Sequence, residues 1–359
     1  MSHPALASRE GNTWPVDYRV ARPYEEHMGD LRSASGLLEL MRQPGIGPGT
    51  ALALAEHFPT VAALAASSPA QRRAVAGARG ADIDVASVEQ ARVEANTEGV
   101  VGYFDDAFPT RLRSIPSPPA VLWVRGTLPN PGTPAVAVVG TRSPTAWGVR
   151  VTESSVEALE GTGTVIVSGL ARGVDGIAHR RALSVGLPTV AILGSGVDAP
   201  TPREHAKLSE EILAAGGALI AEVPPGTSPS ARTLVARNRL QAGMADAVVV
   251  AQCGLDSGTL HTARFAMLQG RTLVVPEPTE AFASEPESAG NLALIHGADP
   301  RTVKASPSDA KRLSERNRFA DSGPRDSAEL QAVMRDIALK RRPSAPTPDT
   351  AVSQMSFEE

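Results

Sequence analysis

The chain has 359 residues, of which 42% are hydrophobic and 21% charged, a composition typical of a globular protein with two or three domains. Its net charge of −4 gives no general attraction to nucleic acid, and the single cysteine, Cys253, excludes an internal disulfide and a cysteine-rich metal site. No apolar run reaches the ~18 residues of a membrane span, and the first 30 residues lack a signal-peptide pattern, so we expect a cytoplasmic protein without membrane contact.

Residues 1–30 show no apolar periodicity and predict a flexible N-terminal segment. Residues 31–98 contain short helical patterns separated by glycine and proline, which predict a small all-helical domain. The turn PGIGPG at 44–49 lies between two of these patterns and resembles a helix-hairpin-helix (SAM-like) element. Past residue 300 the periodicity fades, so residues 301–359 predict one short helix within 326–342 and a disordered tail.

Residues 99–300 alternate between apolar β-type runs and helical stretches. Because the runs have little polar alternation, they predict strands of a parallel sheet covered by helices on both faces. The fold class is therefore α/β, with a doubly wound, mostly parallel Rossmann-like sheet after the helical domain. The expected strands are 121–124, 135–140, 164–169, 189–194, 218–223, 247–252 and 272–276, and the expected helices lie around 147–160, 175–186, 204–215, 236–244 and 259–269.

Glycines, hydroxyls and arginines follow these strands, at the sheet edge where doubly wound proteins bind ligands. Gly140 would let a ligand approach the backbone closely, and an arginine can fork onto phosphate. The pattern is not G-x-G-x-x-G, and no acid ends the second strand to hold a ribose, so an NAD enzyme is not expected. Four guanidinium groups are expected on one rim, where they would suit a phosphodiester backbone: Arg142, Arg172, Arg237 and Arg239.

Five segments carry a family resemblance, in the family's order and at its spacing. They are GTRSPTAWG (140–148), SGLARGVDGIAH (168–179), ILGSGVD (192–198), ARNRLQAGMA (236–245) and SGTLHTA (257–263). On these segments residues 100–298 resemble the DNA-processing protein A (DprA/Smf) family. The resemblance implies an extended Rossmann domain that binds single-stranded DNA, forms a homodimer and loads a RecA-type recombinase in transformation or recombination.

The resemblance also implies which residues contact DNA. We expect no catalytic residue, cofactor or metal. The glycine turn of the helical domain, with Gly45, Gly47 and Gly49, is a second candidate for DNA backbone contact. The positions expected in the main DNA groove are Gly140, Thr141, Arg142, Ser168, Gly169, Arg172, Arg237, Asn238, Arg239, Ser257, Gly258 and Thr259.

Two other functions fit the same groove. Related Rossmann folds cleave nucleoside monophosphates with a PGGxGTxxE loop, but here the loop reads CGLDSGTLHTA, and Thr262 stands where the glutamate would be. A sensor of a nucleotide-derived signal, for instance in anti-phage defence, is the third interpretation. Each glycine turn taken alone is also explained by helix–strand packing.

Overall fold

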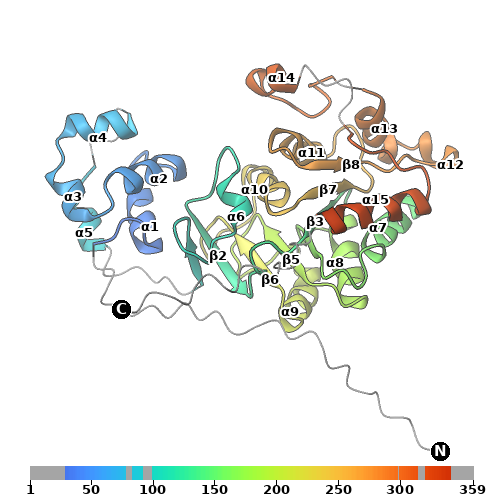
Figure 1. The fold of residues 1–359 in the computed structure, drawn as a ribbon, viewed down its shortest axis with the longest axis horizontal. Coiled ribbons are helices and arrows are strands. Elements are labelled where there is room, and N and C mark those ends of the chain that lie inside the picture. Colours follow the sequence, from blue (N-terminus) through green and yellow to red (C-terminus); the bar gives the residue numbers. More distant parts are fainter. Residues whose placement is uncertain (1–28, 78–82, 92–98, 298, 314–319, 341–359) are drawn as a thin grey trace, which may run out of the picture.

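The protein combines an eight-stranded sheet, helices on both of its faces and a separate group of helices before it (Figure 1). The computed structural model describes residues 29–77, 83–91, 99–297, 299–313 and 320–340. Residues 1–28 of the expected flexible segment and 341–359 of the expected tail lie outside the described residues. The α/β fold class predicted from the sequence is confirmed.

The N-terminal helices form the expected helical region. Ser33 caps the first helix by accepting a hydrogen bond from the Gly36 amide, and Ser68 forms a capping box with Gln71 in the fourth. Buried leucines, among them Leu37 and Leu54, form their core, which continues onto the first two strands of the sheet. These helices are α1 (Ala34–Arg42), α2 (Pro48–His57), α3 (Val61–Ala66), α4 (Pro69–Ala76) and α5 (Val85–Ala91).

The sheet has the order β1-β2-β6-β5-β4-β3-β7-β8. The strands from β6 to β8 in this order are parallel, and β1 and β2 join antiparallel beside β6. From β3 the chain first moves towards β4, β5 and β6 and then returns to place β7 on the other side of β3, so the order reverses between β3 and β7. The strands are β1 (Val100–Gly102), β2 (Val121–Gly126), β3 (Ala135–Val139), β4 (Val165–Ser168), β5 (Thr189–Leu193), β6 (Ala218–Ala221), β7 (Ala247–Val250) and β8 (Thr272–Val274).

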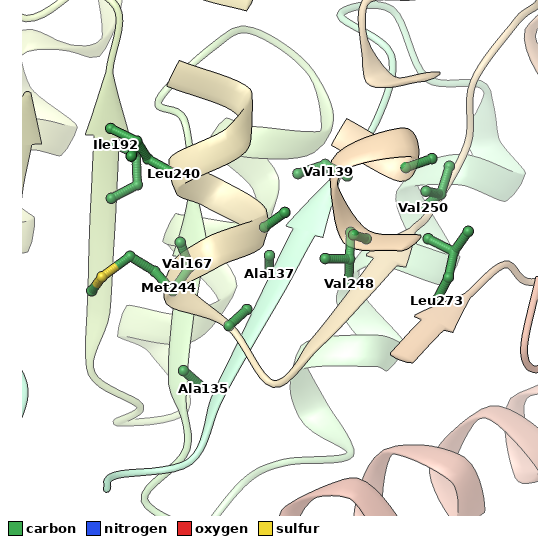
Figure 2. Packing of buried hydrophobic residues seen from close by; sticks show 14 of the residues in the cluster. Ala135, Ala137, Val139, Val167, Ile192, Leu240, Met244, Val248, Val250 and Leu273 are labelled. Carbon is green, nitrogen blue, oxygen red and sulfur yellow. The ribbon is translucent and has the colours of Figure 1, made fainter. Parts of the chain in front are cut away.

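Successive residues of a strand point to opposite faces of the sheet, and both sets are apolar here. Helices therefore cover both faces. Ala137 and Val139 pack beneath α10 and α11, as Figure 2 shows, whereas Val136 and Val138 pack against α7 and α8. Helix α9 lies on the same face as α8. The helices of this domain up to residue 296 are α6 (Thr110–Arg113), α7 (Ala146–Glu157), α8 (Val174–Ser184), η3 (Arg203–His205), α9 (Ala206–Ala214), α10 (Ala231–Met244), α11 (Thr259–Leu268), α12 (Glu280–Ala283), η4 (Pro286–Ser288) and α13 (Ala289–His296).

The structure continues this domain beyond the boundary expected at residue 300. Ser322 bridges to Val274 of β8, and α14 (Pro307–Leu313) lies against α11. Helix α15 (Ser327–Lys340) packs on α7 through Leu330 and Met334, which are four residues apart and therefore share one helix face. Ala338 continues this buried face, and Val333 and Ile337 pack beside it.

His179 on α8 makes folding stability sensitive to acid. Its Nδ1 donates to Thr189 Oγ1 at 2.7 Å, since that hydroxyl uses its own proton on the Ile166 carbonyl. Burial lowers the pKa of His179 to about 3, from the ordinary 6.5. Between these values the unfolded chain binds the proton more strongly, so stability falls as the pH drops below about 6.5.

We therefore expect the folding equilibrium contributed by His179 to weaken by up to about tenfold per pH unit between roughly pH 6 and 4. Chemical denaturation at a series of pH values measures this slope. The variant His179→Gln cannot take up the proton and should show a shallower slope. Equal slopes in the two proteins would contradict the assignment.

Candidate functional site

A cavity of about 910 Å³ opens at the point where the strand order reverses, beyond the carboxyl ends of β3 and β7. This is the place where open parallel sheets bind ligands, because the loops after neighbouring strands diverge there. Its volume lies towards the upper end of the usual ~300–1,000 Å³ for ligand sites. The residues that line it are Val139–Arg142, Ala171, Asp175, Ala231, Leu234, Val235, Arg237, Asn238, Gln241, Gly254–Thr259, Thr262, Pro286, Glu287 and Ala289.

The loop after β3 presents Arg142 at the cavity. The side chain of Arg142 is exposed, and no carboxylate among the described residues pairs with it. The backbone turn is tight, because a Cβ on Gly140 would come within 2.5 Å of Val174. Gly173 has a φ of +68° and would meet the Thr141 carbonyl at 2.4 Å, so both glycines are needed for the loops to pack. Within the described part of the chain, Arg142 is therefore a guanidinium without an ion pair, on a tightly packed loop.

Arg237 lies on the buried side of the cavity, which we call the floor, together with Asp175 and Gln241. The position of its guanidinium group depends on Gly169. The Arg237 Nη1 donates to the Ile192 carbonyl at 3.0 Å, and its Nη2 lies 3.8 Å from the Asp175 carboxylate. A Cβ at Gly169 would lie only 1.4 Å from Arg237 Nη1. Burial raises the pKa of Asp175 and lowers the pKa of Arg237, although each charge favours the ionised form of the other. The opposite charges of Asp175 and Arg237 therefore largely balance each other in the floor of the cavity.

Two buried donors on α10 have no acceptor among the residues that the structure describes. They are Arg237 Nε and Gln241 Nε2, on residues that line the cavity and are four apart on the helix, hence on one face. A buried donor without a partner costs roughly 1–3 kcal/mol, and both atoms are covered in the structure, so a ligand would have to shift these side chains to reach them. Asn238, between them, donates instead to the Gly258 carbonyl at 3.3 Å and ties α10 to the start of α11.

The start of α11 forms another part of the cavity lining. Ser257 Oγ accepts from the Thr259 amide at 3.2 Å, and Gly258 at the N-cap makes no side-chain cap. The positive end of the helix dipole therefore faces the cavity. Besides Asp175, the carboxylates of Asp256 and Glu287 lie on the cavity lining, so the charge of the cavity is mixed and not uniformly basic.

Arg172 and Arg239 do not join this cavity, and the expected convergence of four arginines is wrong for these two. Arg172 follows β4 at the same sheet edge but is exposed and makes a bidentate pair with Glu204, with Nη2 at 2.6 Å from Oε2. Arg239 points away from the cavity on α10 and pairs with Glu222 at 2.7 Å from Nη1. Successive residues of a helix face different directions, which separates Arg239 from Arg237.

Of the remaining predicted positions, some line the cavity and others do not. Ser168 is fully buried, where its hydroxyl donates to the Val138 carbonyl at 2.7 Å, and it does not line the cavity. The hairpin glycines belong to the helical region: Gly45 turns with a φ of 78°, Gly47 caps α2 and Gly49 lies inside α2. The cavity lining includes Gly140, Thr141, Arg142, Arg237, Asn238, Ser257, Gly258 and Thr259 from the predicted set.

Sequence reasoning missed Gln241 and Leu255. Gln241 follows Arg237 by four residues, and this spacing within a helix could have placed it on the same face. Leu255 is 52% exposed beside the cavity, a high value for a leucine. The described residues bring no group of three histidine, cysteine, aspartate or glutamate side chains into a metal-holding arrangement. Within the described ranges, no helix has the length and hydrophobicity that crossing a bilayer requires.

The protein is an extended Rossmann-type α/β protein, with a large cavity at the reversal of strand order. Comparison with known families is more specific. The family model for DNA recombination-mediator protein A matches residues 99–309, and the chain belongs to this family.

Named relatives agree with this assignment. The chain is 40% identical over 179 residues to Protein Smf of Escherichia coli strain K12, covering 50% of this chain and 48% of that protein. It is 36% identical over 213 residues to DNA processing protein DprA of Bacillus subtilis strain 168, covering 58% and 69%. The X-ray structure of DNA processing protein A from Streptococcus pneumoniae is similar with a TM-score of 0.59 and 25% identity, over 72% of this chain and 96% of that one. The chain spans about half the length of most of the curated relatives it matches.

Proposed function

We propose that the protein binds single-stranded DNA at the cavity between β3 and β7 and passes it to a RecA-type recombinase. The observation that carries the proposal is one large cavity lined by Arg142, which pairs with no carboxylate among the described residues, and by Arg237 and Gln241 on α10. Membership in a family of DNA recombination mediators supports the choice of DNA as the ligand.

The geometry supports a division of roles within the site. Arg142 is placed to fork onto a phosphate, and the amides at the start of α11 offer a second phosphate contact. Arg237 and Gln241 line the cavity, and we propose that their side chains shift so that the buried donors contact acceptor atoms of the nucleotide that enters it. Because Asp256 and Glu287 reduce the positive charge, few phosphates are neutralised and we expect a shallow salt dependence.

Recombinase loading and a homodimer belong to the same proposal. A mediator has to hold the strand while leaving much of it accessible to its partner. A cavity at one sheet edge meets this requirement better than a channel that encloses the strand, because it contacts only the nucleotides that reach it. We propose that a second copy of the chain supplies a second site on the same strand.

We propose binding without catalysis. A nucleoside hydrolase needs a carboxylate at the reacting bond, and Thr262 lines the cavity at the position where the related loop carries its glutamate. A nucleotide sensor would use the same donors, so it is separated from a strand-binding protein only by measurement.

Binding of labelled single-stranded DNA, duplex DNA and mononucleotides over a salt series tests the proposal. We expect preference for the single strand, weakening with a slope of about 0.7 per neutralised phosphate. Tight mononucleotide binding without affinity for a strand would instead identify a sensor. Release of free base would identify an enzyme.

Glu204 is expected to hold Arg172 away from DNA. In the variant Glu204→Gln the bidentate pair is lost, so the freed guanidinium should raise affinity for single-stranded DNA by about two- to fivefold and steepen the salt slope by up to ~0.7. Titration at several salt concentrations measures both quantities.

The matched control for this variant is Glu157→Gln. Glu157 pairs with Arg181 at 2.7 Å, near the C-terminal ends of α7 and α8 and thus at the opposite edge of the sheet. The variant Glu157→Gln changes the net charge by the same amount as Glu204→Gln, but it leaves the pair of Arg172 and Glu204 intact. Equal gains in the two variants would show that only net charge matters.

A further inference from the structure

The side chain of Gln252, which follows β7, lies fully buried between the start of α7 and the segment before α13. Its Oε1 accepts from the Thr145 amide at 2.9 Å. Its Nε2 lies 3.0 Å from the hydroxyls of both Thr145 and Ser288. One amide side chain therefore joins three segments that are distant in the sequence.

Gln252 also fixes the other end of the loop that carries Arg142. Its backbone carbonyl accepts from the Thr141 amide at 2.7 Å, so the residues on either side of the 142–144 turn are both bound to Gln252. The surrounding glycines match this arrangement. A Cβ on Gly148 would lie 2.1 Å from the Gln252 Oε1, and a Cβ on Gly140 would lie 2.8 Å from its carbonyl oxygen.

We propose that Gln252 is a positioning residue that sets the orientation of Arg142 for strand binding. The inference rests on the proposed function, because it concerns the same phosphate contact. Arg142 has no ion pair of its own among the described residues, so its direction depends on the backbone of its loop. That backbone is held at Thr141 and Thr145, and only the Thr145 contacts depend on the Gln252 side chain.

The variant Gln252→Leu tests this, because leucine has a similar size and no polar atoms. We expect faster hydrogen exchange at the Thr145 amide and about a tenfold loss of affinity for single-stranded DNA, since a hydrogen bond of the loop is removed. In Gln252→Glu the carboxylate still accepts from the Thr145 amide and from the hydroxyls of Thr145 and Ser288, so affinity and slow exchange should both be retained. If Gln252→Leu does not fold, Thr145→Val removes one of the same contacts and should shift both readouts in the same direction by less.

Thr164→Val is the matched control. It also deletes a buried side-chain hydrogen bond, from Thr164 Oγ1 to Thr162 Oγ1 at 2.7 Å, but at the amino end of β4. It should change stability without changing exchange at Thr145 or DNA affinity.

A double variant separates positioning from general destabilisation. If Gln252 acts through Arg142, then Arg142→Ala with Gln252→Leu should bind no more weakly than Arg142→Ala alone. Additive losses, or unchanged exchange at Thr145 in Gln252→Leu, would overturn the inference. The exchange measurement needs no DNA, so it still tests Gln252 if the wild-type chain fails to bind a strand, a result that would count against the proposed function instead.

Discussion

Replacing Arg142 by alanine is expected to lower affinity for single-stranded DNA by about 10- to 100-fold, since a charge-assisted contact to phosphate is worth roughly 1.5–3 kcal/mol. The salt slope should fall by about 0.7, the value for one phosphate on a single strand. Fluorescence anisotropy with a labelled thymidine oligonucleotide measures both. Because the side chain is exposed and pairs with no carboxylate in the described ranges, the melting temperature should not change.

Arg125→Ala is the control for this prediction. It removes the same charge, but Arg125 lies on β2 opposite Leu219, near the amino end of β6, and pairs with Glu210. Its affinity for DNA should stay within about twofold of wild type, as expected for a charge beyond the Debye length. Equal affinity in Arg142→Ala and wild type would remove Arg142 from the site.

A methyl group at Gly169 is expected to disrupt the cavity floor. The Cβ of Gly169→Ala would lie 1.4 Å from Arg237 Nη1, so the guanidinium has to leave its position beside the Ile192 carbonyl and Asp175. We expect the free energy of unfolding to fall by about 1–3 kcal/mol, because the buried Asp175 loses its cation. DNA affinity should fall as well, since Arg237 and Asp175 both line the cavity and lose their arrangement. Urea denaturation and DNA titration measure the two effects.

Two variants make this prediction specific. Gly49→Ala places a methyl group in α2 with no heavy atom within 4 Å and should leave stability unchanged or slightly raised. In the background Arg237→Ala the clash no longer exists, so Gly169→Ala should add little further destabilisation there. An undiminished cost in that background would place the effect of Gly169 elsewhere.

The sheet could be predicted from the sequence because its strands are buried on both faces. The run at 135–140 and the observed Ala135–Val139 agree within one residue, since a short valine-rich run without polar residues is typical of a strand that is covered on both faces. Helix α10 begins at Ala231, five residues before the expected start. Its cap is the reciprocal pair of Ser230 and Thr233, and a threonine at that position is a weaker cap signal than glutamate or glutamine.

The candidate site could be predicted only in part. The strand-end rule placed Gly140, Arg142 and Thr259 at the cavity, because it depends on topology alone. The partners of the other arginines are not local: Glu204 lies 32 residues from Arg172, and Glu222 lies 17 residues before Arg239. A sequence motif identifies an arginine, but it does not show which distant carboxylate forms an ion pair with that arginine.

Hydrogen–deuterium exchange with and without a single-stranded thymidine oligonucleotide tests the location of the strand most directly. We predict slower exchange in three of the segments that line the cavity, 139–142, 231–241 and 254–262, and no change in β1, β2 or α9. Protection confined to the helical region around 43–50, with those three segments unchanged, would contradict DNA binding in the cavity beyond the carboxyl ends of β3 and β7.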